Sequence, residues 1–459
     1  MEELRILSPT AILGYGFPVQ SFEEGMRRNP HVIAVDAGST DPGPYYLGAG
    51  ISFTDRGAVK RDLEIILPAA LEKGIPVIIG SAGGSGGRPH LEWNIDIIKE
   101  IAEEKGLKFR MAVINAEIDK EYISKKLSEG KVQPLYPNQR LTENELKETG
   151  RIVGQMGVEP FLRALDEEVR VIVAGRAYDP AVFAAAAIQK GYDKGLALHL
   201  GKILECASIA AAPGSGSDSM IGYLGKDYFK VEPLNPIRKC TALSVAAHTL
   251  YEKTNPYILP GPGGMLDLTE TEFIQETERT VRVRGSRFIP SEKYTVKLEG
   301  ARKIGYRTLS IAGIRDPIMI AGIDEVISGV RERVKDNFSS LKMDYFLDFK
   351  VYGRNGVMGA LEPWTDIQSH ELGIIIEAVA RDQATANTIC SFARSTMLHY
   401  GYKGRVATAG NLAFPYSPSD LEAGEVYTFS VYHIIEADDP AELFPIEIIT
   451  VGGSDDFED

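Results

Sequence analysis

Acidic and hydroxyl side chains gather directly after the apolar run HVIAV, in the segment DAGSTDPGP at residues 36–44. Asp36 and Asp41 have carboxylates that can transfer protons or hold a divalent cation such as Mg²⁺, and Ser39 and Thr40 lie between them. The glycines of the segment let backbone N–H groups approach an anion closely. The pattern indicates a ligand site, although a type II turn built on its Pro-Gly pair is an alternative.

A glycine-rich loop, GSAGGSGG at residues 80–87, follows the apolar run IPVII. Such a loop exposes backbone donors at the start of the next helix, so we expect Ser81, Gly83 and Gly84 to bind an anionic part of a substrate. The loop also contains Gly-x-Ser-x-Gly centred on Ser85. That serine lies well past the strand end, which argues against the nucleophile of a hydrolase.

Two further segments add a cation and an acid. In GRAYDP, residues 175–180, Arg176 suits a carboxylate or phosphate, and Asp179 either caps the following helix or faces the ligand. In HLGKILECASIAAA, Glu205 stands among apolar neighbours and is a candidate acid or base. His199 and Cys206 are two helical turns apart, about 10 Å, and cannot hold one metal ion.

Polar loops in the second half of the chain offer further contacts. RNGVMGALEP contains Arg354 and Asn355, and TAGNLAFPYSP contains Asn411. We expect Arg354 and Asn355 to reach the substrate from a second domain.

The elements that position these residues follow a regular order. Apolar runs alternate with polar loops and amphipathic segments that end at glycine, which predicts an α/β fold with a mainly parallel sheet. The polar loops then share the edge of the sheet at the carboxyl ends of its strands. We predict an α/β domain over residues 1–225, a second α+β domain over 226–447 and an acidic C-terminal tail over 448–459.

Composition excludes several classes of protein. The formal net charge of −14, with no basic run, argues against a nucleic-acid partner. No stretch approaches the ~20 apolar residues that cross a bilayer, so we expect no membrane association. The three cysteines are too few and too scattered for a disulfide framework. We expect a cytoplasmic homo-oligomer.

The motifs DAGSTDPGPYYLG, GRAYDPAVFAAAAIQKG, HLGKILECASIAA and VRVRGSRFIPSEKYTVKLEGARKIGYRTLSI occur in this order. Together with NPIRKCTALSVAAHTLYEKTNPYILPGPGGMLDL they resemble the acyclic terpene utilisation AtuA family over nearly the whole chain. The resemblance implies a role in catabolism of acyclic terpenes or branched acyl-CoA esters, beside a small separate partner protein. Two positions differ from the family pattern: Ser81 stands where many members have Asn, and Ala207 where many have Gly.

The leading hypothesis is an enzyme that acts on a small branched organic acid or its acyl-CoA thioester by a hydratase or lyase step. Proton abstraction next to a carbonyl needs a positioned carboxylate and donors for the enolate oxygen. Two alternatives stay open: an ATP- and Mg²⁺-dependent phosphoryl-transfer enzyme of actin-like type, and a non-catalytic subunit or scaffold of an acyl-CoA-metabolising complex. The sequence identifies no cofactor and assigns no metal ligands, with Mg²⁺ on the two aspartates as one option. The candidate catalytic residues are Asp36, Asp41 and Glu205, and the candidate substrate-binding residues are Ser39, Thr40, Ser81, Gly83, Gly84, Arg176, Asp179, Arg354 and Asn355.

Overall fold

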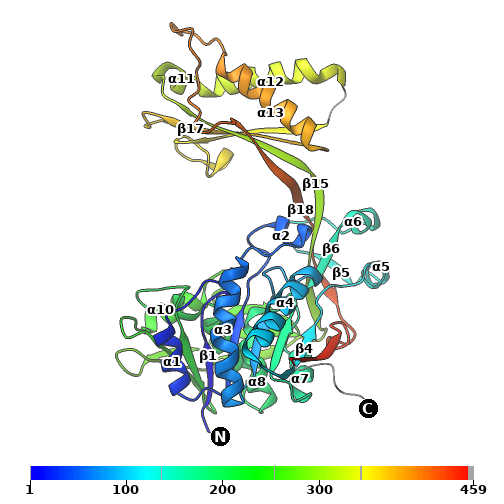
Figure 1. Cartoon of the computed structure of the whole chain (residues 1–459), viewed down its shortest axis with the longest axis vertical. Helices are drawn as coiled ribbons and strands as arrows, with labels where there is room; N and C mark the ends of the chain where they lie inside the picture. Colours follow the sequence, from blue (N-terminus) through cyan, green and yellow to red (C-terminus); the bar gives the residue numbers. More distant parts are fainter. Residues whose placement is uncertain (1, 136, 253, 342–343, 453–459) are drawn as a thin grey trace. The chain divides into compact units, whose positions relative to one another are not determined.

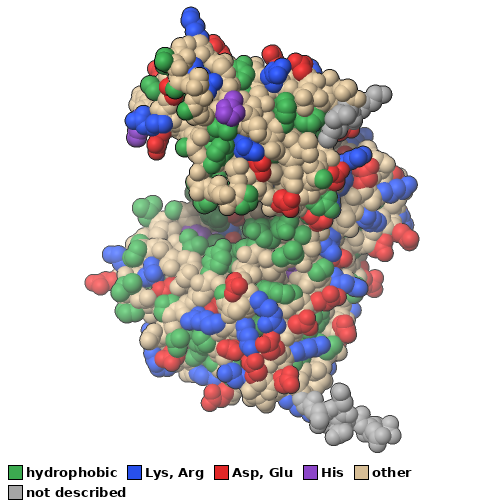
Figure 2. All heavy atoms as spheres, turned by 45° about the horizontal axis from the view of Figure 1, so that its top comes forward, with side chains coloured by type: hydrophobic (Ala, Val, Ile, Leu, Met, Phe, Trp, Pro, Cys, Tyr) green, Lys and Arg blue, Asp and Glu red, His purple; other side chains and the backbone are tan. Residues whose placement is uncertain are grey.

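The computed structural model describes residues 2–135, 137–252, 254–341 and 344–452 and divides into two compact units (Figure 1). Unit 1 comprises Met1–Arg302 and Phe429–Asp459, and unit 2 comprises Lys303–Thr428. Acidic and basic side chains are interspersed over the face shown in Figure 2. Among the described helices, none is long and apolar enough to cross a membrane.

Unit 1 is built on a large mixed sheet. Its central strands β1, β2, β3, β7 and β4 are parallel, and antiparallel strands extend the sheet on both sides. In spatial order the strands are β12 (Glu272–Gln275), β13 (Val281–Arg284), β9 (Phe229–Pro233), β8 (Met220–Leu224), β1 (Leu4–Ser8), β2 (Val32–Asp36), β3 (Val77–Gly80), β7 (Val171–Ala174), β4 (Phe109–Ile114) and β19 (Ile446–Val451). The predicted α/β class is confirmed.

Helices cover both faces of this sheet (Figure 1). One face packs against α1 (Val19–Arg27), α3 (Arg56–Lys73) and α4 (Arg88–Lys105), and the other against α7 (Glu159–Asp166), α8 (Asp179–Gln189) and α9 (Lys194–Leu204). Strand residues alternate between the two layers: Ile33 and Val35 face α3 and α4, whereas Val32 and Ala34 face α8 and α9. Because both faces are covered, the strands are apolar throughout, and each fully buried Ile or Val contributes about 1.5–3 kcal/mol.

Smaller elements complete unit 1. They are α2 (Pro44–Ala49), α5 (Lys120–Ser128), β5 (Val132–Pro134), α6 (Glu143–Glu148), β6 (Arg151–Gly154), η1 (Ala207–Ala210), α10 (Ala242–Thr249), and the antiparallel strands β10 (Ile258–Gly261), β11 (Gly264–Asp267) and β14 (Arg287–Pro290).

Unit 2 is an antiparallel sheet with helices on one face. Its strands are β16 (Tyr345–Tyr352), β17 (Leu372–Ala380) and the distal parts of β15 (Thr295–Ile314) and β18 (Asp420–Glu436). α12 (Ile323–Phe338) and α13 (Gln383–Leu398) pack on this sheet around Ile374, Ile376 and Val330 (Figure 1). The unit also contains α11 (Pro317–Ala321), η2 (Ser339–Leu341) and η3 (Gly359–Leu361).

The division between the units differs from the expected boundary at residue 225. Strands β9, β13 and β12 lie beyond that boundary, yet they extend the unit 1 sheet through antiparallel pairing with β8 and with each other. The predicted tail at 448–459 also begins within a strand, since β19 ends at Val451 and pairs with β4. Residues 453–459 lie outside the described part of the chain.

The loops at the carboxyl ends of β3 and β7 approach each other so closely that Gly86 is required. Gly86 has a φ of 67°, and an added Cβ would lie 2.1 Å from the backbone nitrogen of Arg176. Gly74, which ends α3, has a similar φ of 66° and nothing within 4 Å of the same position. The two glycines therefore share a backbone conformation but differ in the space around them.

Replacing each of these glycines by alanine separates the cost of the left-handed backbone conformation from the cost of a steric clash. Gly74→Ala should lower the free energy of unfolding by about 1 kcal/mol, the cost of a left-handed alanine. Gly86→Ala should lower it by about 3 kcal/mol, because a clash with backbone adds to that cost. Urea denaturation followed by circular dichroism measures both, and equal losses would contradict the close packing of the two loops.

Candidate functional site

Asp36 ends β2 with its side chain on the same face as Val32 and Ala34, toward α8 and α9. The residue is buried, and its Oδ1 has no hydrogen-bond partner among the described residues. Burial, followed by the nearby carboxylate of Asp179, raises its pKa well above the ordinary value of 3.8. A carboxyl group in this setting retains its proton to a higher pH and can act as an acid.

Arg176 lies in the loop after β7, and its guanidinium donates hydrogen bonds to several residues of the site. Its Nε donates to Oε2 of Glu299 at 2.8 Å, and its Nη1 donates to Oδ1 of Asp179 at 3.0 Å and to Oγ of Ser81 at 3.1 Å. Burial acts to lower the pKa of Arg176, but the carboxylates of Glu299 and Asp179 outweigh it and raise the value. The guanidinium is therefore a buried, permanently charged link between the loops after β3 and β7 and strand β15.

Lysines hold two further carboxylates of the site. Lys202 Nζ lies 2.5 Å from Oε1 of Glu205 at the end of α9, and both side chains are buried. Lys297 Nζ lies 2.6 Å from Oε1 of Glu299. Burial opposes the charge on Glu299, but Arg176 and Lys297 together lower its pKa to about 2. Glu299 is therefore a carboxylate at neutral pH.

These side chains surround two neighbouring cavities of unit 1, of about 330 and 360 Å³. We name the first the apolar cavity, because hydrocarbon and aromatic side chains form much of its wall, and the second the charged cavity. The two cavities share the acidic residues Asp41, Asp179, Glu205 and Glu252. The apolar cavity is lined by Ala11, Ile12, Tyr15, Asp36, Gly38, Ser39, Asp41, Pro42, Phe53, Asp179, Glu205, Cys206, Ile209, Tyr251 and Glu252, and the charged cavity by Asp41, Gln155, Arg176, Tyr178, Asp179, Pro180, Lys202, Glu205, Glu252, Pro260, Lys297 and Tyr432.

The segment after β2 contributes in more than one way. Asp41 is exposed, lines both cavities and accepts a hydrogen bond from Ser39 Oγ at 2.9 Å. Thr40 is buried, and its carbonyl accepts from Gly43 N at 3.0 Å, which closes a turn around Asp41. The segment thus forms both a turn and part of the cavity wall.

The glycine-rich loop lies behind the cavities. Ser81 is fully buried, and its Oγ accepts from Arg176 and from the Ala177 backbone at 3.3 Å. Added Cβ atoms on Gly83 and Gly84 would meet the His90 side chain at 2.7 Å and the Phe53 ring at 2.4 Å. Neither Ser81 nor these glycines lines the two described cavities, so their close packing supports the loops around the site.

Ser85 and Cys206 lack the features of a nucleophile. Ser85 Oγ is buried and has no hydrogen-bond partner in the described part of the chain. Burial raises the pKa of the Cys206 thiol, which keeps it protonated although it lines the apolar cavity. His199 is buried between Ser286 and Thr249 and belongs to the core.

The predicted contacts from the second half of the chain all belong to unit 2. Arg354 forms an ion pair with Asp324, Asn355 N donates to the Val351 carbonyl at 3.0 Å, and Asn411 Nδ2 donates to the carbonyl of Met397 at the end of α13. Their role in substrate binding stays a prediction.

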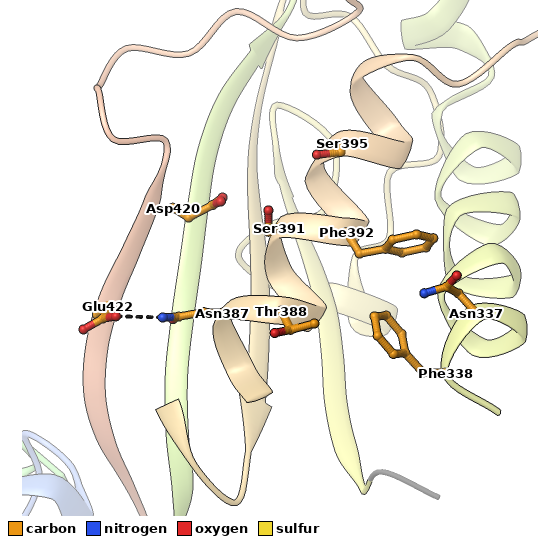
Figure 3. A pocket seen from close by; sticks show the side chains of 9 residues that line it. All are labelled: Asn337, Phe338, Asn387, Thr388, Ser391, Phe392, Ser395, Asp420 and Glu422. Atoms are coloured by element: carbon orange, nitrogen blue, oxygen red, sulfur yellow. Dashed lines mark hydrogen bonds between the residues drawn. The ribbon is translucent and has the colours of Figure 1, made fainter. Parts of the chain in front are cut away.

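Unit 2 contains a larger, shallow cavity of about 720 Å³ beside α13 (Figure 3). Its acids are already engaged: Asp420 accepts two hydrogen bonds from Arg394, and Glu422 accepts from Asn387 at 2.7 Å. The remaining wall consists of Asn337, Phe338, Thr388, Ser391, Phe392 and Ser395. With no titratable cluster left to transfer a proton among these residues, the unit 1 cavities are the stronger candidate for chemistry.

Several site residues carried little sequence signal. Lys202 precedes Glu205 by three positions in a helical segment, a spacing that brings side chains together on one face. Lys297 and Glu299 come from a strand far along the chain, and no local pattern links them to Arg176. In the described residues, no group of three or more His, Cys, Asp and Glu side chains is arranged to hold a metal ion.

A comparison with protein families matches the chain to the model described as acyclic terpene utilisation family protein AtuA, over residues 56–215 and 238–417. Comparisons with curated proteins and with solved structures gave no match.

The burial of Asp36 predicts a pH-dependent gain in stability for Asp36→Asn. Above pH 3.8 the unfolded chain releases the Asp36 proton while the folded site retains it, so the wild type loses stability as pH rises from that point. The neutral variant avoids this loss and should be more stable at pH 7 by about 1 kcal/mol or more, with the difference disappearing near pH 4. Thermal unfolding at pH 4 and at pH 7 measures this difference in stability between the variant and the wild type.

The matched control is Asp41→Asn, which changes the exposed carboxylate of the same segment and should leave stability within about 0.5 kcal/mol at both pH values. A destabilised Asp36→Asn variant at pH 7 would contradict the account of a buried carboxyl whose pKa is raised by desolvation.

Proposed function

The chain belongs to the acyclic terpene utilisation AtuA family, and from that premise we propose that it is a catabolic enzyme that transfers protons next to a carbonyl group. Its substrate is a small branched organic acid or the acyl thioester of one, and the reaction is a hydration, a dehydration or a related lyase step. The observation that carries the proposal is the pairing, across one cavity, of a buried carboxyl with a raised pKa and a carboxylate held by lysine.

The proposed acid and base have opposite environments. Asp36 is desolvated and faces other acids, which raises its pKa, whereas Glu205 lies 2.5 Å from the Lys202 ammonium, a neighbour that favours a negative charge. Enzymes that use one carboxyl group as acid and another as base at the same pH set the two pKa values apart by giving the groups different environments. Both side chains line the apolar cavity. Asp36 is therefore proposed as the general acid and Glu205 as the general base.

The proposed reaction is an elimination of water. Glu205 takes the proton from the carbon next to the carbonyl, and the electrons of that C–H bond form the enolate. As the carbon–carbon double bond forms, the β-hydroxyl leaves with the proton of Asp36 as water. Glu205 ends protonated and Asp36 ionised, and exchange with solvent restores both. Hydration is the same sequence reversed.

The walls of the site fit the remaining parts of such a substrate. Ile12, Tyr15, Phe53, Ile209 and Tyr251 offer an apolar surface for a branched hydrocarbon chain. In the adjoining charged cavity, Arg176 uses Nε and Nη1 for its described hydrogen bonds, which leaves Nη2 able to donate to a carbonyl or enolate oxygen. Asp41 lines both cavities, and we propose that it contacts the substrate near the reacting carbon.

The test is solvent deuterium exchange. In D₂O the wild type should incorporate deuterium next to the carbonyl of 3-methylbutanoate or its CoA thioester, and should remove water from the corresponding 3-hydroxy compounds, as followed by mass spectrometry. Asp36→Asn and Glu205→Gln should each lower the dehydration rate by about 10²-fold or more, because each removes one proton-transfer group.

Asp267→Asn, which changes a half-buried acid on β11 outside the two cavities, is the control and should react as the wild type does. Full activity in both site variants would contradict the assignment. Reaction with none of these compounds, together with stabilisation by ATP and Mg²⁺, would favour phosphoryl transfer instead.

A further inference from the structure

We propose that Tyr178 is a catalytic hydrogen-bond donor, whose phenol binds the oxygen of the substrate carbonyl and of the enolate that forms from it, beside Arg176. The inference rests on the proposed function for the reaction and deepens it, because that function leaves Tyr178 without a role. Its basis is the position of this side chain in the wall of the charged cavity.

The backbone places Arg176 and Tyr178 on the same side of one extended segment. Met156 pairs with this segment in parallel: its N donates to the Arg176 carbonyl at 3.1 Å, and its carbonyl accepts from Tyr178 N at 2.8 Å. Alternate residues of an extended chain point to the same side. Ala177 therefore packs in the core, whereas Arg176 and Tyr178 both line the charged cavity.

The ring of Tyr178 is closely packed on its apolar side. It also lines a narrow slot of about 10 Å³, room for about one water molecule, whose other walls include Leu198, Leu259 and Phe288. A Cβ added to Gly261 on β10 would lie 3.0 Å from Cε1 and Cζ of the ring and 3.2 Å from the hydroxyl oxygen. The phenol oxygen is therefore held in place by contacts of the protein itself, as a preorganised donor requires.

The phenol has a hydrogen available to donate. Within the described part of the chain, the Tyr178 hydroxyl makes no hydrogen bond to another residue. Burial, followed by the neighbouring Glu205 and Asp179 of the charged cavity, raises the pKa of Tyr178 above its ordinary value of 10. The hydroxyl stays protonated at neutral pH, and a ligand oxygen in the cavity can accept from it.

A donor at this place acts more strongly on the enolate than on the carbonyl. Negative charge develops on the substrate oxygen as Glu205 takes the proton from the neighbouring carbon, and hydrogen bonds to charged acceptors are the stronger ones. The phenol keeps its own proton throughout and stabilises the oxyanion together with Nη2 of Arg176. Tyr178 should therefore raise kcat while changing KM little.

An enolate mimic tests the donor without turnover. The nitronate of 2-methyl-1-nitropropane has the carbon skeleton and the charged oxygens of the enolate of 3-methylbutanoate, and the neutral nitroalkane resembles the ground state. Freshly prepared nitronate is mixed with the protein in mildly alkaline buffer, and stopped-flow absorbance follows its binding before it is reprotonated. Isothermal titration calorimetry measures the neutral compound.

Tyr178→Phe should bind the nitronate at least about tenfold more weakly than the wild type, because a hydrogen bond to a charged group is lost. Its affinity for the neutral nitroalkane should change less than about twofold, since the ring is kept. Tyr192→Phe is the matched control, because the Tyr192 hydroxyl donates to the Glu2 carbonyl and lines neither cavity. Equal nitronate affinity in Tyr178→Phe and the wild type, or no nitronate binding by the wild type, would overturn the inference.

Gly261→Ala provides a second arm, because its methyl group displaces the phenol without removing it. Alone it should weaken nitronate binding about threefold, and added to Tyr178→Phe it should have no further effect. Gly373→Ala on β17 is the control, since its Cβ would lie 3.7 Å from the nearest atom, in Tyr352. Losses that add in the double variant would contradict the role of the phenol. Circular dichroism checks that each variant is folded, and the Tyr178→Phe comparison decides alone if Gly261→Ala is not.

The dehydration assay separates this inference from the proposed function. Tyr178→Phe should lower kcat about 10²-fold and change KM less than about threefold. Weaker nitronate binding in Tyr178→Phe, with full activity in Asp36→Asn and Glu205→Gln, would support the donor and refute the assigned acid and base. Activity that falls in those two variants but not in Tyr178→Phe would do the reverse.

Discussion

The buried ion pair between Arg176 and Glu299 is the constraint on which the rest of the site depends. It joins a loop after a central parallel strand to a strand more than a hundred residues later, in a region from which water is largely excluded. Removing either partner would leave an uncompensated buried charge, which costs about 3–5 kcal/mol. Ser81, Asp179 and Lys297 all take their positions from this pair, so the geometry of the cavities follows from it.

The sequence predicted the parts of the site that follow from local rules. Asp36, Arg176 and Asp179 come together because parallel strands end at one edge of a sheet, and Glu205 joins them from the end of a buried helix. Glu299 could not be predicted, because its pairing with Arg176 spans 123 positions and leaves no local pattern. The division into two units differs from the predicted boundary for a related reason: hydrophobic alternation identifies a strand but does not indicate which sheet it joins.

Two differences from the family pattern fall at backbone positions of the same kind. Ser81 has a φ of 49° and Ala207 a φ of 44°, both in the left-handed region that glycine and asparagine adopt most easily. The resembled family has Asn and Gly there. In this chain Ser81 offsets part of the conformational cost through its hydrogen bonds with Arg176 and Ala177.

The route of the chain through its two units has a consequence for how they could be separated. Only β15 and β18 carry the chain into and out of unit 2, and the two strands are neighbours in one sheet. Unit 2 thus has the topology of a module inserted into a hairpin, and a short turn joining residues 302 and 429 would close the hairpin without it. The family match over 238–417 extends through most of unit 2, so it covers parts of both units.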